Sequence, residues 1–245
     1  MKYAIISDIH SNLEAFQIVI DRIHQEKVDK IICLGDLVGY NANPNECIEL
    51  AKDENIQCIL GNHDAAVIGK ADINFFNIIA KQAILWTKEK ISPKNFVFLE
   101  SLSENCSVDS DFFIVHGSPE DRDEYIFTLQ EARHHFEYLL KNSISLCFFG
   151  HTHRRAIYHH TVKGNYKDHT GKELLKLRKK DYYMINPGGV GQPRDYDPRA
   201  SFLFYDSEKN MIEMIRIEYD IEKCAQKILD AGLDTRLAQR LFFGM

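Results

Sequence analysis

Five short clusters of polar residues, each at the end of an apolar run, carry the side chains of this 245-residue chain that could do chemistry. In sequence order they are Asp8-Ile9-His10, Gly35-Asp36, Gly61-Asn62-His63-Asp64, His116-Gly117 and Gly150-His151-Thr152-His153. They offer carboxylate and amide oxygens and imidazole nitrogens, which are suitable ligands for divalent cations. The pattern therefore predicts a site for a pair of divalent metal ions.

The position of the clusters at strand ends explains how they could meet. The apolar runs that precede them are predicted β-strands at residues 3–6, 31–34, 58–60, 112–115 and 146–149. In an open α/β sheet, side chains just beyond the carboxyl ends of the strands converge on one crevice. Residues far apart in the sequence can therefore share one pocket.

Some of these residues also have a structural explanation when taken alone. An aspartate after a glycine, such as Asp36, is common in turns. Asp64 either orients His63 or caps the helix that follows, and the sequence leaves both alternatives open. His63 need not bind metal, because a histidine beside a metal-bound phosphate can protonate the leaving oxygen.

The elements that must position these residues alternate between strand and helix, which is typical of an α/β fold. Ser11 and Glu14 have the spacing of a capping box, so a helix is expected to begin at Leu13. Asn43 is the expected cap of a helix that begins at Pro44. Further helices are predicted at about 74–90, where Pro93 closes the helix, and at 129–141, 221–231 and 234–242. Further strands are predicted at 96–99, 156–161 and 182–185, with a hairpin formed by 201–205 and 211–218.

Composition narrows the classes of function. The formal net charge is −6 and the pI is about 6.0, so the chain has no general attraction to anionic membranes or nucleic acid. We expect no stable nucleic-acid complex and no membrane association. No apolar run approaches 18 residues and no signal peptide is recognised, which leads us to expect a cytoplasmic location. The six cysteines show no C-x-x-C spacing, and Cys33, Cys58 and Cys147, which lie inside apolar runs, are expected to be core residues and not part of a disulfide framework or a zinc site.

One segment, residues 163–180, is strongly basic, with seven basic and two acidic residues. We interpret residues 1–245 as a single domain with a basic, hairpin-like insertion near 161–181. One alternative is that the insertion is simply solvated surface. The other is that it forms a basic rim that attracts an anionic substrate.

The ordered series D-x-H, GD, GNHD, HG and GHTH resembles the signature of the calcineurin-like metallophosphoesterases. The segment Asn186 to Arg194 also resembles the NPGSVGQPR loop of small prokaryotic phosphodiesterase-type members. This resemblance implies a two-sheet sandwich of mixed sheets flanked by helices. It also implies a phosphoesterase in which a hydroxide that bridges two metal ions attacks phosphorus in line.

The resemblance assigns roles to individual residues. One metal ion would be held by Asp8, His10, Asp36 and His153, and the other by Asp36, Asn62, His116 and His151. His63 would be the catalytic residue that is not a ligand. Apart from the resemblance, we expect Asp64 to assist His63 in catalysis, and Asn12 and Arg194 to contact the substrate. The ligand types permit manganese, iron, zinc, nickel or cobalt, and we take manganese as the first expectation.

The expected substrate is a small phosphorylated molecule, and a phosphodiester before a phosphomonoester. Protein phosphatases of the superfamily carry GDxVDRG, but here Gly39 replaces the second aspartate, which argues against that class. A nucleotidase-type phosphomonoesterase is one alternative. A catalytically idle binding scaffold on the same fold is another.

Overall fold

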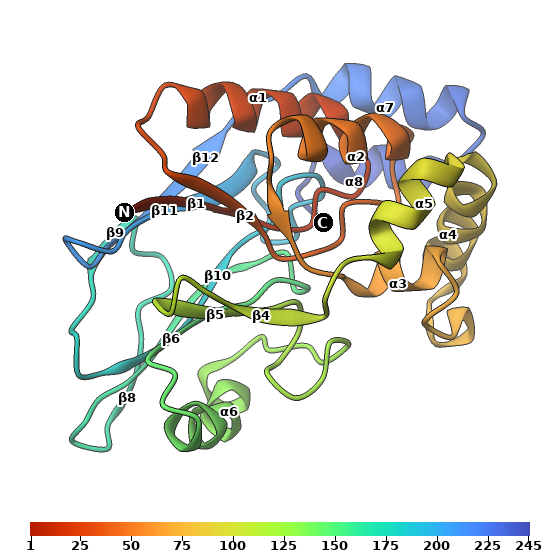
Figure 1. Ribbon diagram of the computed structural model, residues 1–245. Helices are drawn as coiled ribbons and strands as arrows, with labels where there is room; N and C mark the ends of the chain where they lie inside the picture. The colour runs from red at the N-terminus through yellow and green to blue at the C-terminus, as the bar shows by residue number, and fades with distance from the viewer.

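The computed structural model describes residues 1–245 and consists of two six-stranded mixed sheets packed face to face (Figure 1). The first sheet has the order β3-β2-β1-β11-β12-β9 and the second β4-β5-β6-β10-β7-β8. The strands of the first sheet are β1 (Lys2–Ile6), β2 (Lys30–Cys33), β3 (Gln57–Cys58), β9 (Leu174–Lys176), β11 (Ala200–Asp206) and β12 (Met211–Ile217). Those of the second are β4 (Asn105–Val108), β5 (Phe112–Val115), β6 (Leu146–Phe148), β7 (Arg155–His160), β8 (Tyr166–Asp168) and β10 (Tyr182–Pro187). The predicted α/β sandwich of two mixed sheets is confirmed.

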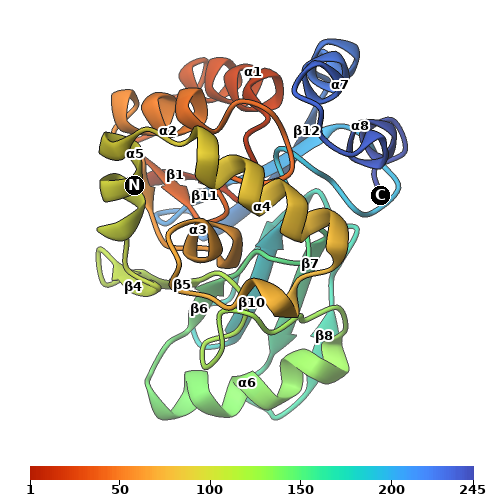
Figure 2. The same ribbon diagram turned by 90° about the vertical axis from the view of Figure 1, so that its right-hand side faces the viewer.

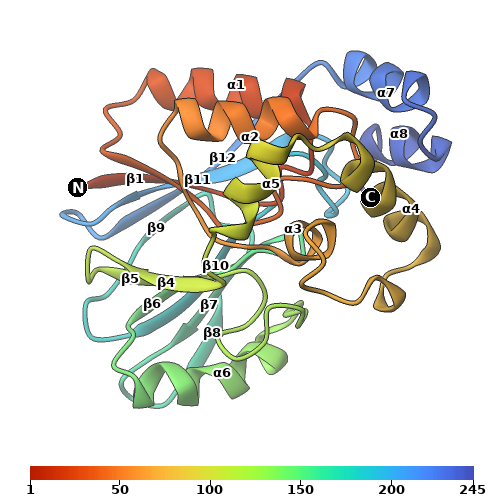
Figure 3. The ribbon, with the colours of Figure 1, turned by 45° about the vertical axis from the view of Figure 1, so that its right-hand side comes forward.

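Helices cover both outer faces of this sandwich. Helices α1 (Leu13–His24) and α2 (Pro44–Asp53) lie over the first sheet, and α6 (Leu129–Lys141) lies over the second (Figure 3). The short helix α3 (Asn62–Val67) and the helix α4 (Ile78–Lys90) lie at one end of the sandwich, the end that faces the viewer in Figure 2. The remaining helices are the 3₁₀ turn η1 (Ile73–Phe75), α5 (Pro93–Glu100), α7 (Ile221–Asp230) and α8 (Thr235–Leu241).

Strand β1 shows how one apolar run serves two cores. Tyr3 and Ile5 belong to the buried cluster between the two sheets, whereas Ala4 and Ile6 belong to the cluster beneath the helices. Alternate side chains of a strand point to opposite faces. Because both faces of β1 are covered, the strand is apolar at every position from Tyr3 to Ile6. The two residues that follow the strand, Ser7 and Asp8, are buried as well.

The first helix begins where it was predicted, but with a different cap. Leu13 is the first residue of α1, and the side-chain oxygen of Asn12 accepts a hydrogen bond from the amide of Ala15. Asn12 is thus the N-cap, and the capping box predicted from Ser11 is wrong. The reason is that Ser11 has a positive φ of 59° and lies one residue too early to reach the free amides of the helix.

The segment around Pro93 was predicted incorrectly. Residues 96–99 were expected to form a strand, but they lie inside helix α5, which begins at Pro93. The side chain of Ser92 caps this helix by accepting from the amide of Asn95 at 3.4 Å. Proline at the first helical position is favourable because its missing N–H would be unpaired there in any case.

The basic segment is not one hairpin. Its strand β8 pairs with β7 in the second sheet, and β9 pairs with β12 in the first. The segment therefore links the edges of the two sheets instead of folding back on itself. The predicted hairpin of β11 and β12 is present, with Ala200 opposite Ile217. No helix is long and apolar enough to span a membrane.

Candidate metal centre

The five clusters predicted from the sequence come together in one buried pocket. Three overlapping groups of side chains have ligand atoms within 4.8 Å of one another. They are Asp8 with His10 and His153, His10 with Asp36 and His63, and Asp36 with His116 and His151. Asp36 belongs to two groups and lies between the others, as a carboxylate that joins two adjacent cation sites would.

The distances around Asp36 support this central position. Its Oδ2 atom lies 3.4 Å from Nε2 of His10 on one side and 3.4 Å from Nε2 of His116 on the other. On the His10 side, Oδ1 of Asp8 lies 3.4 Å from Nε2 of His153. On the His116 side, Oδ1 of Asn62 lies 3.1 Å from Nε2 of His116. Seven of the predicted ligands are therefore arranged as two neighbouring sets that share Asp36.

Backbone carbonyls fix the protonation of three of the histidines. Nδ1 of His10 donates to the carbonyl of Val38 at 3.0 Å, and Nδ1 of His116 donates to that of Leu34 at 2.7 Å. Nδ1 of His153 donates in the same way, at 2.6 Å, to a carbonyl of the 186–194 loop. In each neutral ring the proton is therefore on Nδ1, and the lone pair of Nε2 points into the pocket.

The pocket brings imidazole lone pairs and carboxylate oxygens close together, and a bound cation would stabilise this arrangement. Nε2 of His10 faces Nε2 of His153 at 3.2 Å, although neither atom carries a proton in this tautomer. Both carboxylate oxygens of Asp8 and one of Asp36 are buried without a hydrogen-bond partner. No lysine or arginine forms an ion pair with either aspartate. Buried charges are normally paired or bound to metal, and this donor set of oxygen and imidazole nitrogen fits divalent transition metals.

His151 is held by its other nitrogen. Its Nε2 donates to the carbonyl of Asp123 at 3.1 Å, so Nδ1 is the atom available as a ligand. The ring of Tyr125 stacks on His151 with centroids 3.9 Å apart. The segment that carries Asp123 and Tyr125 therefore orients a candidate ligand, although nothing in the sequence pattern marked it for that role.

The ligands occupy an unusual backbone conformation. Asp8, His10, Asp36, His151 and His153 all have positive φ angles, between 47° and 65°. Such left-handed conformations cost a non-glycine residue about 1–2 kcal/mol each. Strain of this kind clusters at functional sites, because the surrounding structure holds it in place. Here it turns side chains from separate strand ends toward one point.

Glycines provide the close approach that this packing needs. A Cβ atom on Gly61 would lie 2.1 Å from Oδ1 of Asp36, and one on Gly39 would lie 2.6 Å from Nδ1 of His63. Any side chain at Gly39 would therefore displace His63. The positive φ of 103° at Gly39 favours glycine there as well.

Charge and burial perturb the titration of the pocket. Burial raises the pKa of Asp8 to about 6. Burial opposes ionisation of Asp36 too, but His116 and His10 outweigh it and hold the pKa of Asp36 well below its usual range. Burial lowers the pKa of His10 and His153, whereas Asp36 overcomes burial at His116 and raises its pKa to about 9.

His63 differs from the other histidines of the pocket. Its buried Nδ1 has no hydrogen-bond partner, and no backbone carbonyl anchors it. Aromatic rings hold it in place: His10 and Phe76 meet it edge-on at centroid distances of 4.8 and 5.1 Å, and Tyr40 lies at 4.4 Å. Burial lowers the pKa of His63 to about 4. Its nitrogens are therefore left for metal or substrate.

The structure decides between the two alternatives for Asp64. Its carboxylate accepts hydrogen bonds from the amides of Gly61 at 3.1 Å, Val38 at 3.0 Å and Leu37 at 3.3 Å. It makes no hydrogen bond with His63. Asp64 therefore caps α3 and fixes the adjacent loop, and a catalytic role for it stays a prediction.

The two residues expected to bind substrate are used differently. Asn12 is buried, caps α1 and donates from Nδ2 to the carbonyl of Gly191 at 2.8 Å, so both ends of its side chain are occupied. These contacts give Asn12 a structural role, and its contact with substrate stays a prediction. The guanidinium of Arg194 lies 5.5 Å from the ring centroid of Tyr40, and its Nε is buried without a partner. Arg194 therefore keeps a free donor near the pocket.

A cavity of about 700 Å³ opens over the cluster. Asn62, His63 and His151 contribute to its lining, together with aromatic residues that include Tyr40, Phe76 and Tyr125. Sequence reasoning missed this aromatic wall, because aromatic residues in these positions are not distinguishable from core residues. No residue of the basic segment 163–180 lines the cavity, so the prediction that this segment forms its rim is not supported.

Comparison with known proteins agrees with this geometry. The calcineurin-like phosphoesterase superfamily domain matches residues 1–210. The chain is 43% identical to the uncharacterized protein MJ0912 of Methanocaldococcus jannaschii, over 98% of this chain and 97% of that protein. It superimposes on a crystal structure of a metallophosphoesterase from Sphaerobacter thermophilus with a TM-score of 0.86 and 36% identity, covering 100% and 99% of the two chains. The hypothetical protein PH1004 from Pyrococcus horikoshii OT3 has the same fold, with a TM-score of 0.82, 19% identity and coverage of 100% and 98%. The chain belongs to the calcineurin-like phosphoesterase superfamily.

Proposed function

We propose that this protein is a metal-dependent phosphoesterase that hydrolyses small phosphodiesters. The observation that carries the proposal is the pair of ligand sets joined by Asp36, in which buried carboxylates and imidazole rings converge without a lysine or arginine. Asp8, His10, Asp36 and His153 would hold one divalent ion. Asp36, Asn62, His116 and His151 would hold the other. Two such ions supply Lewis acidity toward the phosphoryl oxygens and an activated water molecule.

The proposed task of His63 is to stabilise the leaving oxygen of the substrate. Its ring lies within reach of the His10 and Asp36 ligand atoms and also lines the open cavity. Unlike His10, His116 and His153, it donates to no backbone carbonyl, so it is free to donate a hydrogen bond or a proton to substrate. Tyr40 and Phe76 fix the orientation of its ring.

The cavity above the pocket favours a substrate with an organic group on the phosphate. Its volume of about 700 Å³ exceeds what a bare phosphate requires, and Tyr40, Phe76 and Tyr125 give it aromatic walls. Arg194, with one unpartnered donor beside Tyr40, is suited to bind a phosphoryl oxygen. These features support phosphodiesters over phosphomonoesters as the preferred class.

A direct test compares bis(p-nitrophenyl) phosphate with p-nitrophenyl phosphate in the presence of manganese. We expect turnover of both, with a higher kcat/KM for the diester. Chelation should abolish turnover, and manganese should restore it. Absence of metal-dependent turnover with either ester, in a protein that contains bound metal, would contradict the proposal. A higher kcat/KM for the monoester would favour a nucleotidase-type activity instead.

The binding-scaffold alternative gains no support from the pocket. A scaffold requires neither strained ligands nor unpartnered carboxylates, and both cost stability. Metal analysis of the purified protein separates the two alternatives. We expect close to two divalent ions per chain, whereas a protein that binds none would favour the scaffold.

A further inference from the structure

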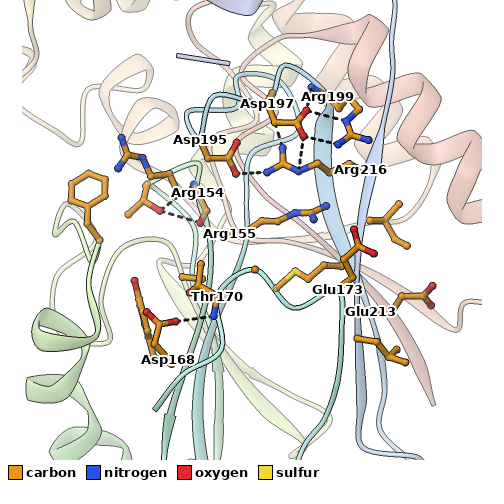
Figure 4. A pocket seen from close by; sticks show the side chains of 18 of the residues that line it. Arg154, Arg155, Asp168, Thr170, Glu173, Asp195, Asp197, Arg199, Glu213 and Arg216 are labelled. Carbon is orange, nitrogen blue, oxygen red and sulfur yellow. Dashed lines mark hydrogen bonds and ion pairs between the residues drawn. The ribbon is translucent and has the colours of Figure 1, made fainter. Parts of the chain in front are cut away.

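A second large cavity lies on the other side of the segment that carries His151 and His153. It has a volume of about 850 Å³ and is lined by β7 of the second sheet, β12 of the first, and the loops around residues 170 and 197 (Figure 4). Thr152, Arg154 and Arg155 line this cavity, but none of the candidate metal ligands does. It is therefore a separate site.

Some of the charges in this second cavity neutralise one another. Arg216 forms ion pairs with Asp195 and Asp197, and Arg199 forms an ion pair with Asp197 at 2.6 Å. These pairs are drawn as dashed lines at the upper end of the view in Figure 4. The four residues form a closed network that leaves little charge for a ligand.

Arg155 is not part of this network. Its only side-chain hydrogen bond runs from Nε to the hydroxyl of Ser201 at 2.7 Å, and it forms no ion pair, although the nearby carboxylates of Asp195, Asp197 and Glu173 act on its charge. Its Nη2 atom is buried and has no partner. The side chain as a whole is half-buried, and an anion whose oxygen accepts from Nη2 would satisfy this free donor.

Arg154 adds a second cation to the same wall. Its Nε donates to the carbonyl of Arg194 at 2.8 Å, and its guanidinium lies 5.2 Å from the ring centroid of Phe127, but it forms no ion pair. Arg154 and Arg155 therefore present guanidinium N–H groups without carboxylate partners. Planar guanidinium groups bind carboxylate and phosphate oxygens in pairs.

The rim of the cavity has the opposite charge. Asp168, Glu173 and Glu213 also line it, are exposed, and form no ion pair. These carboxylates repel polyanions and attract an ammonium group. We infer that this cavity binds a small zwitterion, whose carboxylate or phosphate contacts Arg155 and Arg154 and whose ammonium group faces the acidic rim.

Calorimetric titration of the metal-loaded protein tests this inference. The probes are β-alanine and O-phosphoethanolamine as zwitterions, with acetate and inorganic phosphate as the matching simple anions. We expect at least one zwitterion to bind saturably and at least tenfold more tightly than its simple anion. Equal affinity of zwitterion and simple anion, or no saturable binding of either zwitterion, would overturn the inference. Because binding requires no turnover, failure of the phosphoesterase assay would not affect this result.

Three variants locate the site. Arg155→Gln should weaken binding of the zwitterion at least tenfold, and Arg155→Lys should weaken it less. Arg199→Gln is the matched control, because Arg199 lines the same cavity but is already paired with Asp197. It should change affinity less than threefold. Binding of O-phosphoethanolamine that survives unchanged in Arg155→Gln would assign it to the metal pocket and overturn the inference. A thermal melt of each variant confirms folding, which Arg155→Gln should retain because Arg155 is only half-buried and forms no ion pair.

Discussion

The two cavities use the same kinds of charged side chain in opposite ways. In the metal pocket, Asp8 and Asp36 are buried with only histidines beside them and no lysine or arginine paired to them. In the arginine-lined cavity, Asp195 and Asp197 are paired with arginines, and it is the Nη2 atom of the Arg155 guanidinium that lacks a partner. An unpaired buried charge indicates the opposite charge of the missing ligand. The comparison therefore predicts a cation for one cavity and an anionic group for the other.

The sharpest way to break this comparison is to remove the shared carboxylate of the metal pocket. We expect Asp36→Asn to lose at least one metal ion per chain and to reduce kcat/KM by on the order of 10³-fold, because it removes central electrostatic stabilisation. Metal analysis and steady-state kinetics with the aryl diester measure both effects.

Asp195→Asn is the matched control for this change, since Asp195 is a half-buried carboxylate that is already paired with Arg216 and lies outside the metal pocket. It should leave metal content and turnover close to wild type. Full metal content and full activity in Asp36→Asn would show that Asp36 does not join the two ligand sets.

The next effect concerns His63, which lies in the metal pocket but is not anchored as a ligand. We expect His63→Gln to lower kcat roughly a hundredfold or more while metal content stays unchanged. The loss should be larger for a diester with an alkyl leaving group than for the p-nitrophenyl ester, because a poor leaving group depends more on protonation. His160→Gln, on strand β7, is the control that should retain activity.

A His63→Gln protein that also loses metal would make His63 a ligand instead. The grouping of His63 with His10 and Asp36 makes this a real alternative to test. Equal losses for the two leaving groups would argue against proton donation.

Asp64 is a buried carboxylate whose partners are backbone amides, so it needs no metal. Its removal is expected to affect the stability of the fold. Asp64→Ala leaves three buried amides without an acceptor, and we expect the free energy of unfolding to fall by about 2–4 kcal/mol. Urea unfolding of the metal-free protein measures this change. Asp64→Asn keeps one carbonyl oxygen and should lose less stability and little activity. A loss of activity in Asp64→Asn as large as that of His63→Gln would support its predicted catalytic role.

Much of the metal pocket could be predicted from the sequence because each ligand directly follows an apolar run. The strand 112–115 was predicted with its observed bounds, and the helix 129–141 was as well. Both have patterns that are decided locally, by apolar residues and by the Thr128 and Glu131 capping box.

What the sequence did not reveal depends on contacts between distant segments. Asp64 was ambiguous because its partners, Leu37 and Val38, lie in another loop. Residues 96–99 resemble a strand because four residues are too few to show helical periodicity. Strand β4 was not predicted, because Val108 is its single buried residue and it has no apolar run. The arginine-lined cavity was not foreseen, because it is assembled from the edges of two sheets and the loops that join them.

The smallest expected effect is on the pH dependence of stability, to which His63 of the metal pocket contributes and Arg155 of the other cavity does not. The pKa of His63 is lowered to about 4 in the folded protein, against 6.5 for an unperturbed histidine. Between these values the unfolded chain binds a proton that the folded chain does not, so stability is lost as the pH falls from about 6.5 to about 4. In the metal-free protein this contributes at most about 1.4 kcal/mol per pH unit. Asp8, with its raised pKa, acts in the opposite direction, so only the difference between wild type and His63→Gln isolates the contribution of His63.

Urea unfolding of the chelated proteins at a series of pH values measures that difference. We expect the His63→Gln curve to fall less steeply with acid than the wild-type curve. Arg155→Gln should shift the whole curve without changing its slope, because a guanidinium does not titrate in this range. Parallel curves for wild type and His63→Gln would mean that His63 accepts a proton as readily in the folded protein as in the unfolded chain, and its burial among aromatic rings would then not govern its proton affinity.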